Sequence, residues 1–453
     1  MSRPLAASLL AAAISTAPSF ALGQAWLVQS GVTARGEYND NYFFSTVDKE
    51  SAFTGTIAPF VSVARKTEAS DVTGLLAVGG NKVWGLPDSS DYLNVRFALN
   101  GTLREARTLW TGNASFVRER SLQSISRPTG IVLEVATTNT GSVTGKYTYD
   151  LAERWSAGAT AGWTGNYYDS VDGGVNANAL SDNNQYFAGG NLGYSYSDRT
   201  QFTMSAVVSH YTSDITSSDS LTATLGVAHQ FSQRLTASAS LGGYWSNIKA
   251  DEFILVCPTT PVLCDTGAVP RIPILSGTER RESGALFGGS ISYAFSERTK
   301  FAANLAETIS PDGTGTITKT DNAGASLLHR FSERISSRLG ATYTRTKFPT
   351  ALSGSSTTEY YGGEAGISFQ LAERWTLDGA YRHLKAKYSE NNLEPESNVV
   401  FVSIAYNWPD VPMTNWMGAP PEIVRGVPGA GPVSLPEERS APEAEPPAPL
   451  PEN

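Results

Sequence analysis

The sequence predicts an all-β protein: a transmembrane up-and-down antiparallel β-barrel of 16–18 strands, with 18 as the best estimate. Three observations predict this fold. Long stretches alternate apolar and polar residues, a short turn motif recurs along the chain, and aromatic residues end many alternating stretches. The composition agrees, because Gly (42) and Tyr (19) are plentiful and charged residues make up only 17%. Such residues suit strands and tight turns.

The alternating stretches have period two. In Trp155–Trp163, "WSAGATAGW", one face carries Trp and Ala and the other carries Ser, Gly and Thr. Leu235–Trp245 and Leu93–Leu99 behave in the same way. These runs extend over about 10–13 residues, which is what a tilted strand needs to cross a bilayer, whereas strands of soluble sandwiches average about 5–6. The length therefore favours a membrane barrel over a β-sandwich.

The recurrent motif explains how the strands are joined. "FSER" occurs at 295–298 and 331–334, "LAERW" at 151–155 and 371–375, and four looser relatives are "ARKTE", "REAR", "YSDRT" and "FSQRL". Each copy lies between two alternating stretches, as a short periplasmic turn would. Eight turns join sixteen strands. A first strand at about Leu27–Tyr38 and a last at about Asn398–Trp408 raise the number to eighteen, with both ends in the periplasm.

Three segments are expected along the chain: a signal peptide at 1–21, an outer-membrane β-barrel at 26–408, and a Pro-rich periplasmic tail at 409–453. The leader has an early Arg3, an apolar run and small residues before a cleavage point after Ala21, or after Ala25. A membrane anchor is the alternative, but the apolar run is too short to span a bilayer. The tail is either solvated and disordered or a tether for a periplasmic partner or the cell wall.

The two cysteines, Cys257 and Cys264, lie in the longest predicted loop, about Ile248–Ser283. In an exported chain, one local disulfide is expected between them. No His or acidic cluster accompanies them, so no metal site is predicted.

Neither enzymatic chemistry nor nucleic-acid binding is predicted. The four histidines, of which His229 and His329 each precede the Phe of a turn motif by two residues, show no metal-binding spacing. The formal net charge of −9 argues against nucleic acid, which needs a basic surface. No cofactor is predicted.

The lumen is therefore the candidate site. Parity assigns eight charged residues to the inward face: Arg35, Glu37, Arg96, Lys300, Arg338, Glu364, Asp378 and Arg382. With five cations and three anions, they predict a polar pore with a slight cationic bias, suited to polar or anionic solutes. The alternative is that these charges only hydrate the lumen or pair with each other.

The "LAERW" and "FSER" turns, the long alternating strands and a last strand ending on Trp408 resemble the outer-membrane β-barrel porins that often accompany surface-polysaccharide gene clusters. The tail after Trp408 departs from the usual pattern, which ends on that aromatic. The resemblance implies a conduit in the outer membrane of a Gram-negative bacterium, with membrane lipids and the barrel-assembly machinery as partners. For some relatives it implies exopolysaccharide export with a periplasmic partner. A structural or adhesive barrel without transport is the alternative, and an outer-membrane hydrolase is the least favoured.

Overall fold

The computed structural model describes residues 26–46, 48–86, 91–120, 137–169, 181–214, 216–256, 272–311, 317–348, 356–389 and 393–408. The predicted signal peptide, both cysteines and the Pro-rich tail lie outside these residues.

Eighteen antiparallel strands form one sheet, which closes where β18 pairs with β1. The predicted fold class and strand number are confirmed. The strands are β1 (Leu27–Asn39), β2 (Ala52–Lys66), β3 (Ser70–Trp84), β4 (Tyr92–Arg104), β5 (Thr108–Arg120), β6 (Thr137–Ala152), β7 (Trp155–Asp169), β8 (Asn183–Ser197), β9 (Thr200–Ser213), β10 (Thr216–Ser232), β11 (Leu235–Val256), β12 (Ile272–Ser296), β13 (Thr299–Pro311), β14 (Ile317–Arg330), β15 (Ile335–Phe348), β16 (Ser356–Ala372), β17 (Trp375–Tyr388) and β18 (Glu396–Trp408).

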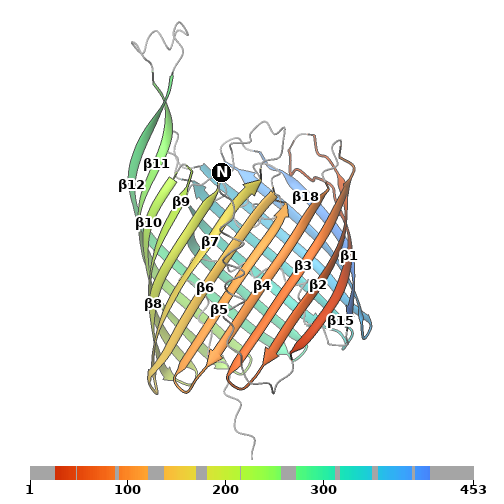
Figure 1. Ribbon diagram of the computed structural model, residues 1–453, viewed down its shortest axis with the longest axis horizontal. Coiled ribbons are helices and arrows are strands. Elements are labelled where there is room, and N and C mark those ends of the chain that lie inside the picture. The colour runs from red at the N-terminus through yellow and green to blue at the C-terminus, as the bar shows by residue number, and fades with distance from the viewer. Residues whose placement is uncertain are drawn as a thin grey trace, which may run out of the picture.

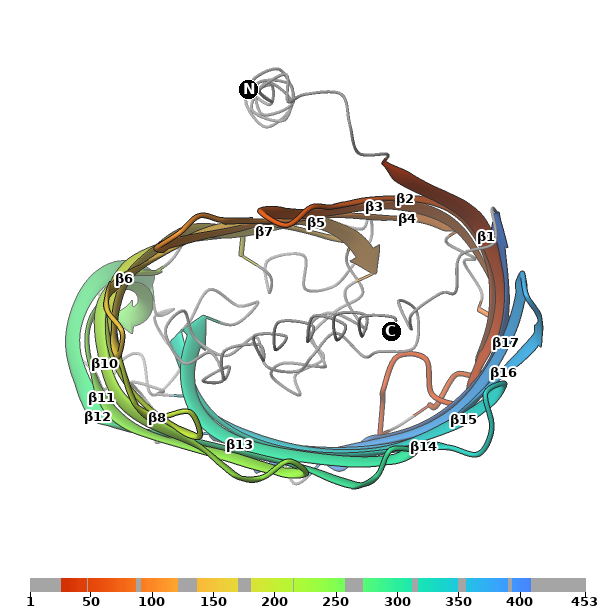
Figure 2. The ribbon, with the colours of Figure 1, turned by 90° about the horizontal axis from the view of Figure 1, so that it is seen from below.

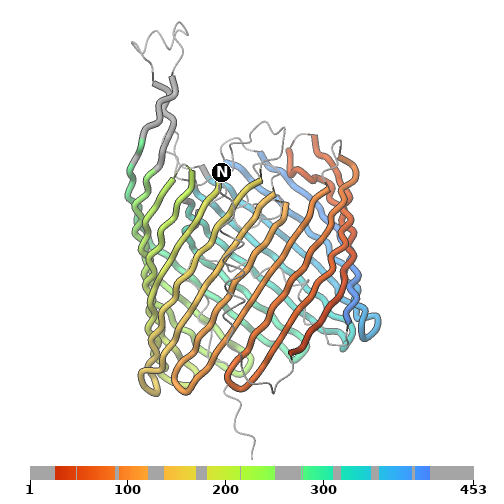
Figure 3. The backbone as a smooth tube through the Cα atoms, viewed as in Figure 1, coloured from red at the N-terminus to blue at the C-terminus, as the bar shows by residue number. Residues whose placement is uncertain are grey.

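The eight predicted turns lie where the sequence motifs placed them, between β2 and β3, β4 and β5, and so on to β16 and β17. They gather at one end of the barrel (Figures 1 and 3). Ser232, Ser296 and Ser332 close their turns in the same way, each accepting the backbone N–H of the Arg two residues later at 3.2 Å. The motif is therefore turn chemistry.

The outward face of the barrel is apolar. Leu241 is 70% exposed, and the same parity along other strands exposes Ile57, Leu225, Ile367 and Val402. Such an exposed apolar surface is stable only in contact with lipid or another apolar partner. The apolar part of β11 runs from Leu235 to Trp245. At ~3.3 Å per residue and a tilt of ~40°, these residues climb roughly 25 Å, the height of an outer-membrane apolar belt.

Within the described ranges, no helix is both long and apolar enough to span a bilayer.

The predicted loop at about Ile248–Ser283 is wrong in part. β11 continues to Val256 and β12 begins at Ile272, so the two strands pair over 22 residues of β11. β-Branched residues such as Ile254, Val256 and Ile274 favour this extension. The hairpin rises well beyond the neighbouring strands (Figure 1).

The seam between β12 and β13 is the shortest in the barrel. Its first rung at the turn joins Ser296 to Thr299, and its last joins Gly288 to Ala306. Beyond that rung β13 pairs only with β14, and its end bends into the ring of strands (Figure 2).

Candidate functional site: the barrel lumen

The loop between β1 and β2 identifies the inward face of the strands. Loop 40–51 lies inside the ring (Figure 2), where Phe44 packs on Tyr360 of β16 and Ala386 of β17. Residues of the same parity on β16 and β17, and the residues paired with them across the sheet, therefore face the lumen.

All eight residues assigned from the sequence have this inward parity. Residues paired directly across neighbouring strands face the same side of the sheet. The register therefore extends the inward assignment around the barrel, for example from Glu364 to Arg382 and from Ala77 to Arg96. They lie on β1, β4 and β13 and on β15 to β17, namely Arg35, Glu37, Arg96, Lys300, Arg338, Glu364, Asp378 and Arg382.

Three of these residues form one cluster on β15, β16 and β17. Glu364 accepts hydrogen bonds from Arg338 and from Arg382, the latter at 2.9 Å from Nη2 and 3.1 Å from Nε. All three side chains are partly buried. One carboxylate thus holds two guanidinium groups, and the cluster carries a net single positive charge.

A second pair lies on β1. Arg35 forms an ion pair with Glu37, and its guanidinium carbon lies 3.8 Å above the centre of the Phe401 ring of β18. The cation–π contact and the ion pair together fix the Arg35 side chain against the wall. This pair is neutral overall.

The other inward charges assigned from the sequence are not paired within the described residues. Arg96 and Lys300 are exposed to the lumen, and neither has an ion pair or hydrogen bond with the described residues. The half-buried carboxylate of Asp378 likewise has neither kind of contact with the described residues. The prediction missed a further cation, Lys146 of β6, which pairs with Thr111 and Thr160 and is likewise exposed. Lys146 directly precedes the outward Tyr147, so the period-two rule could have placed it on the inward face.

One arc of the lumen wall is uncharged. From β7 through β10, and on β11 as far as Ile248, the inward described residues are Ser, Thr, Asn, Gln, Gly, aliphatic or aromatic. Hydroxyl pairs tie neighbouring strands here, including Ser205 with Thr224 at 2.6 Å and Ser220 with Ser246 at 3.0 Å. The lumen therefore has a charged arc and an opposing arc of hydroxyl and amide groups.

Loop 40–51 is held in place inside the outer end of the barrel. Asn41 donates from Nδ2 to the backbone oxygens of Ser45 and Glu396, at 2.7 and 2.8 Å, and accepts the Ser45 N–H. Lys49 Nζ lies 3.1 Å from Glu396 Oε1. These bonds connect the loop to β18 and fold its apolar tip over β16 and β17.

The same loop reaches the opposite side through Tyr42. Arg120, at the end of β5, donates to the Tyr42 hydroxyl at 3.4 Å, and its guanidinium carbon is 5.1 Å from the Tyr92 ring centre. Burial raises the pKa of the Tyr42 phenol above its ordinary value, although Arg120 acts in the opposite direction, so the phenol remains protonated at neutral pH. Loop 40–51 thus lies between β4–β5 and β16–β17 and narrows this part of the lumen.

The histidines have structural contacts. His229 and His329 each place Nδ1 2.8 Å from the hydroxyl of the Thr paired with it on the neighbouring strand, Thr200 and Thr299, and each ring meets the Phe two residues later edge-on. Within the described ranges, no group of three His, Cys, Asp or Glu side chains is placed to hold a metal ion.

A closed antiparallel barrel with an apolar belt, short turns at one end and a polar lumen is the architecture of the β-barrel proteins of the Gram-negative outer membrane. The chain is assigned to that class and that membrane from its own strands and belt.

No family model matches the sequence, and no curated protein matches it. Among solved structures, the chain is similar to Pseudomonas aeruginosa OpdK with vanillate (TM-score 0.42, 11% identity, 84% of this chain and 98% of that chain). It is also similar to a BenF-like porin from Pseudomonas fluorescens Pf-5 (0.42, 15%, 84% and 98%) and to Acinetobacter baumannii OccAB1 (0.42, 9%, 84% and 97%). These scores are too low to transfer the role of any residue.

Proposed function

We propose that this protein is an outer-membrane channel for small polar solutes, with a preference for anions. The observation that carries the proposal is the unequal charge of the lumen wall. Over the strand residues whose side chains are described, ten inward cations face seven inward carboxylates, a surplus of three positive charges: Arg35, Lys66, Arg96, Arg104, Lys146, Arg280, Lys300, Arg330, Arg338 and Arg382 against Glu37, Asp71, Glu119, Asp150, Glu282, Glu364 and Asp378. Arg96, Lys146 and Lys300 have no partner among the described residues, Asp378 offsets one of these charges, and the Arg338–Glu364–Arg382 cluster adds one positive charge.

The physical basis is that charged side chains lining a pore set ion preference electrostatically. Arg35, Arg338 and Arg382 share two carboxylates and contribute less to the field, whereas Arg96, Lys146 and Lys300 face the lumen uncompensated. Loop 40–51 restricts the size of solute that can pass.

Planar-bilayer recording of the purified protein tests this proposal. Stepwise currents in KCl, together with a reversal potential of the sign for chloride preference in a salt gradient, are expected. A protein that inserts without current steps would instead be a structural barrel.

Exopolysaccharide export through the same lumen is a second candidate. The uncharged arc on β7–β11 favours it, because rows of hydroxyl and amide groups suit hydrogen bonding to sugars. Deletion of the gene should then lower surface polymer, and restoring the intact chain should recover it. Unchanged polymer after deletion would leave the small-solute channel alone.

A further inference from the structure

We infer that the seam between β12 and β13 is a lateral portal, through which single-chain amphiphiles pass between the outer leaflet and the lumen. This inference rests on the proposed conduit, because a portal needs a lumen to open into. It starts from the last rung of the seam, Gly288 with Ala306.

The seam ends inside the apolar belt. On β12, Tyr293 pairs with Leu235 at the inner edge of the belt, and Ser283 pairs with Trp245 at its outer edge. The last rung to β13, at Gly288, lies midway between them. Among the described residues, the backbone of Ser283–Phe287 therefore has β11 on one side and no strand on the other, over the half of the belt that faces the outer leaflet.

Lipid cannot satisfy these backbone groups. Irregular or unpaired backbone at membrane depth is tolerated only where it lies against protein or a water-filled cavity. The unpaired edge of β12 consequently marks a place where the lumen reaches the wall of the barrel.

Glu307 explains why β13 leaves the sheet here. The next rung would pair it with Phe287 and direct its carboxylate outward between Phe287 and Leu305, both exposed on the apolar surface. Instead Glu307 is 9% exposed and pairs with Lys319 Nζ at 2.8 Å. Ile309 packs on Tyr211 and Ile248, which belong to the inward face of β9 and β11. The outer part of β13, at Glu307–Ile309, is thus docked inside the lumen.

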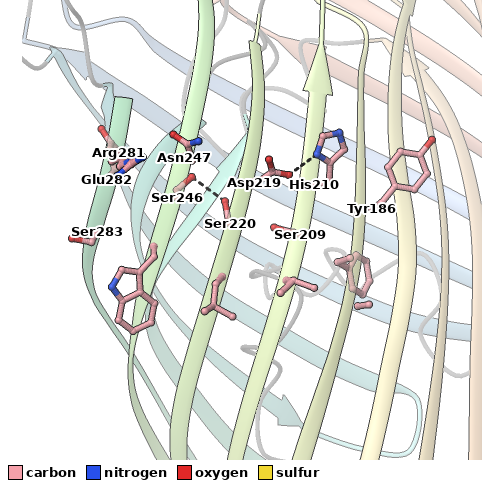
Figure 4. A pocket seen from close by; sticks show the side chains of 15 residues that line it. Tyr186, Ser209, His210, Asp219, Ser220, Ser246, Asn247, Arg281, Glu282 and Ser283 are labelled. Carbon is pink, nitrogen blue, oxygen red and sulfur yellow. Dashed lines mark hydrogen bonds and ion pairs between the residues drawn. The ribbon is translucent and has the colours of Figure 1, made fainter. Parts of the chain in front are cut away.

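The outer surface beside this edge is hollowed. A cavity of about 780 Å³ spans β8 to β12 and reaches the β12 edge at Arg281, Glu282 and Ser283. Its polar side carries His210, whose Nδ1 lies 2.7 Å from Asp219 Oδ1 (Figure 4).

The two parts of this cavity differ in polarity. Toward the membrane it is lined by Val208, Leu221 and Trp245, which are exposed on the apolar belt. Toward the outer end, His210, Asp219, Asn247 and Arg281 offer both donors and acceptors. An amphiphile with one apolar chain and a polar head matches this arrangement, and the head would enter the lumen beside the unpaired edge.

A disulfide that closes the seam tests the portal. Leu286 and Thr308 are both inward and would form the next inward rung if β13 continued along β12. Leu286→Cys with Thr308→Cys is made in the full chain carrying Cys257→Ser and Cys264→Ser. The matched control is Ser238→Cys with Ser290→Cys, which cross-links an existing rung between β11 and β12 outside the cavity.

The proteins are reconstituted in phosphatidylcholine vesicles, and a nitrobenzoxadiazole-labelled lysophosphatidylethanolamine is added outside. Albumin, which is too large for the lumen, extracts the probe that stays outside. The parent protein should raise the rate at which the probe becomes inaccessible to albumin at least tenfold over the rate in protein-free vesicles. The oxidised seam variant should lose this acceleration and recover it on reduction, while the control and the KCl conductance of all variants stay unchanged.

Unaltered probe transfer in the oxidised seam variant, or no transfer by a parent protein that conducts KCl, would overturn the portal. Absence of KCl conductance in the parent would overturn the channel proposal separately. If non-reducing gels show that the cross-link does not form, Glu307→Leu serves instead. It removes the charge that keeps β13 from pairing and should slow probe transfer at least fivefold; an unchanged rate with this variant also overturns the portal.

Discussion

Arg382 donates hydrogen bonds from Nε and Nη2 to a single carboxylate oxygen of Glu364, at 3.1 and 2.9 Å. The other oxygen accepts from Arg338. These arginines were predicted as pore-lining from parity alone, and the structure shows that they share one counter-charge. Glu364 therefore controls how much positive charge this side of the wall presents to a solute.

Glu364→Gln should make the pore more anion-selective, because it removes the counter-charge and leaves both guanidinium groups in place. The reversal potential in a KCl gradient measures the change. Arg382→Gln is the matched control with the opposite charge change, and it should shift the potential the other way. Shifts of the same sign for the two variants would contradict the assignment of this cluster to the lumen.

Leu241→Arg should destabilise the barrel by roughly 2–4 kcal/mol, because Leu241 is exposed near the middle of the apolar belt and the substitution places a cation in lipid. Ser240→Arg, on the inward face, should fold nearly normally. Urea unfolding in lipid vesicles and heat-modifiable gel mobility compare the two. Equal destabilisation would refute the assigned faces of β11.

Phe44→Ala should release loop 40–51 from β16 and β17, because the Phe44 ring is the apolar contact with Tyr360 and Ala386. Burial of a Phe side chain is worth about 3 kcal/mol or more, so the loop should open while the barrel persists. Larger or noisier single-channel currents are expected. Phe43→Ala, at an exposed neighbour, is the control; identical currents in the parent and both variants would show that the loop does not restrict the lumen.

Single cysteines should react according to the orientation of the barrel. In a Cys257→Ser, Cys264→Ser background, Asp219→Cys should react with an impermeant maleimide added to intact cells, because the Asp219 side chain is 73% exposed at the outer end. Glu153→Cys and Glu333→Cys, in the short turns, should react only after the outer membrane is opened. Labelling of the turns from outside would invert the orientation.

Much of the fold could be predicted because period-two alternation and turn chemistry are local properties of the chain. The repeated "FSER" and "LAERW" segments marked the turns, and parity placed Arg35, Arg96 and Arg338 on the inward face. Lys146 could have been found by the same rule. Pairing of the two arginines by Glu364 required the register between β15, β16 and β17, which alternation does not determine.

Two structural features could not be predicted from local sequence patterns. The inward fold of loop 40–51 depends on Asn41 and Glu396, which lie 355 positions apart in the chain. The early end of the β12–β13 seam depends on Glu307, which has outward parity in an otherwise apolar row. An acidic residue at an outward position could have indicated the early end of the seam. The inward bend of β13, however, depends on the ion pair of Glu307 with Lys319 and on the packing of Ile309 against the inner wall, which are tertiary contacts.

The central claim is that uncompensated lumenal cations give the channel its preference for anions. The most direct measurement is the reversal potential of Arg96→Gln, Lys146→Gln and Lys300→Gln combined, recorded in a KCl gradient. The matched control, Arg118→Gln with Lys385→Gln and Lys387→Gln, removes the same charge from the outward face. We predict that the lumenal variant shifts toward cation selectivity while the control keeps the parent value. An unchanged potential in the folded, conducting lumenal variant would contradict this claim.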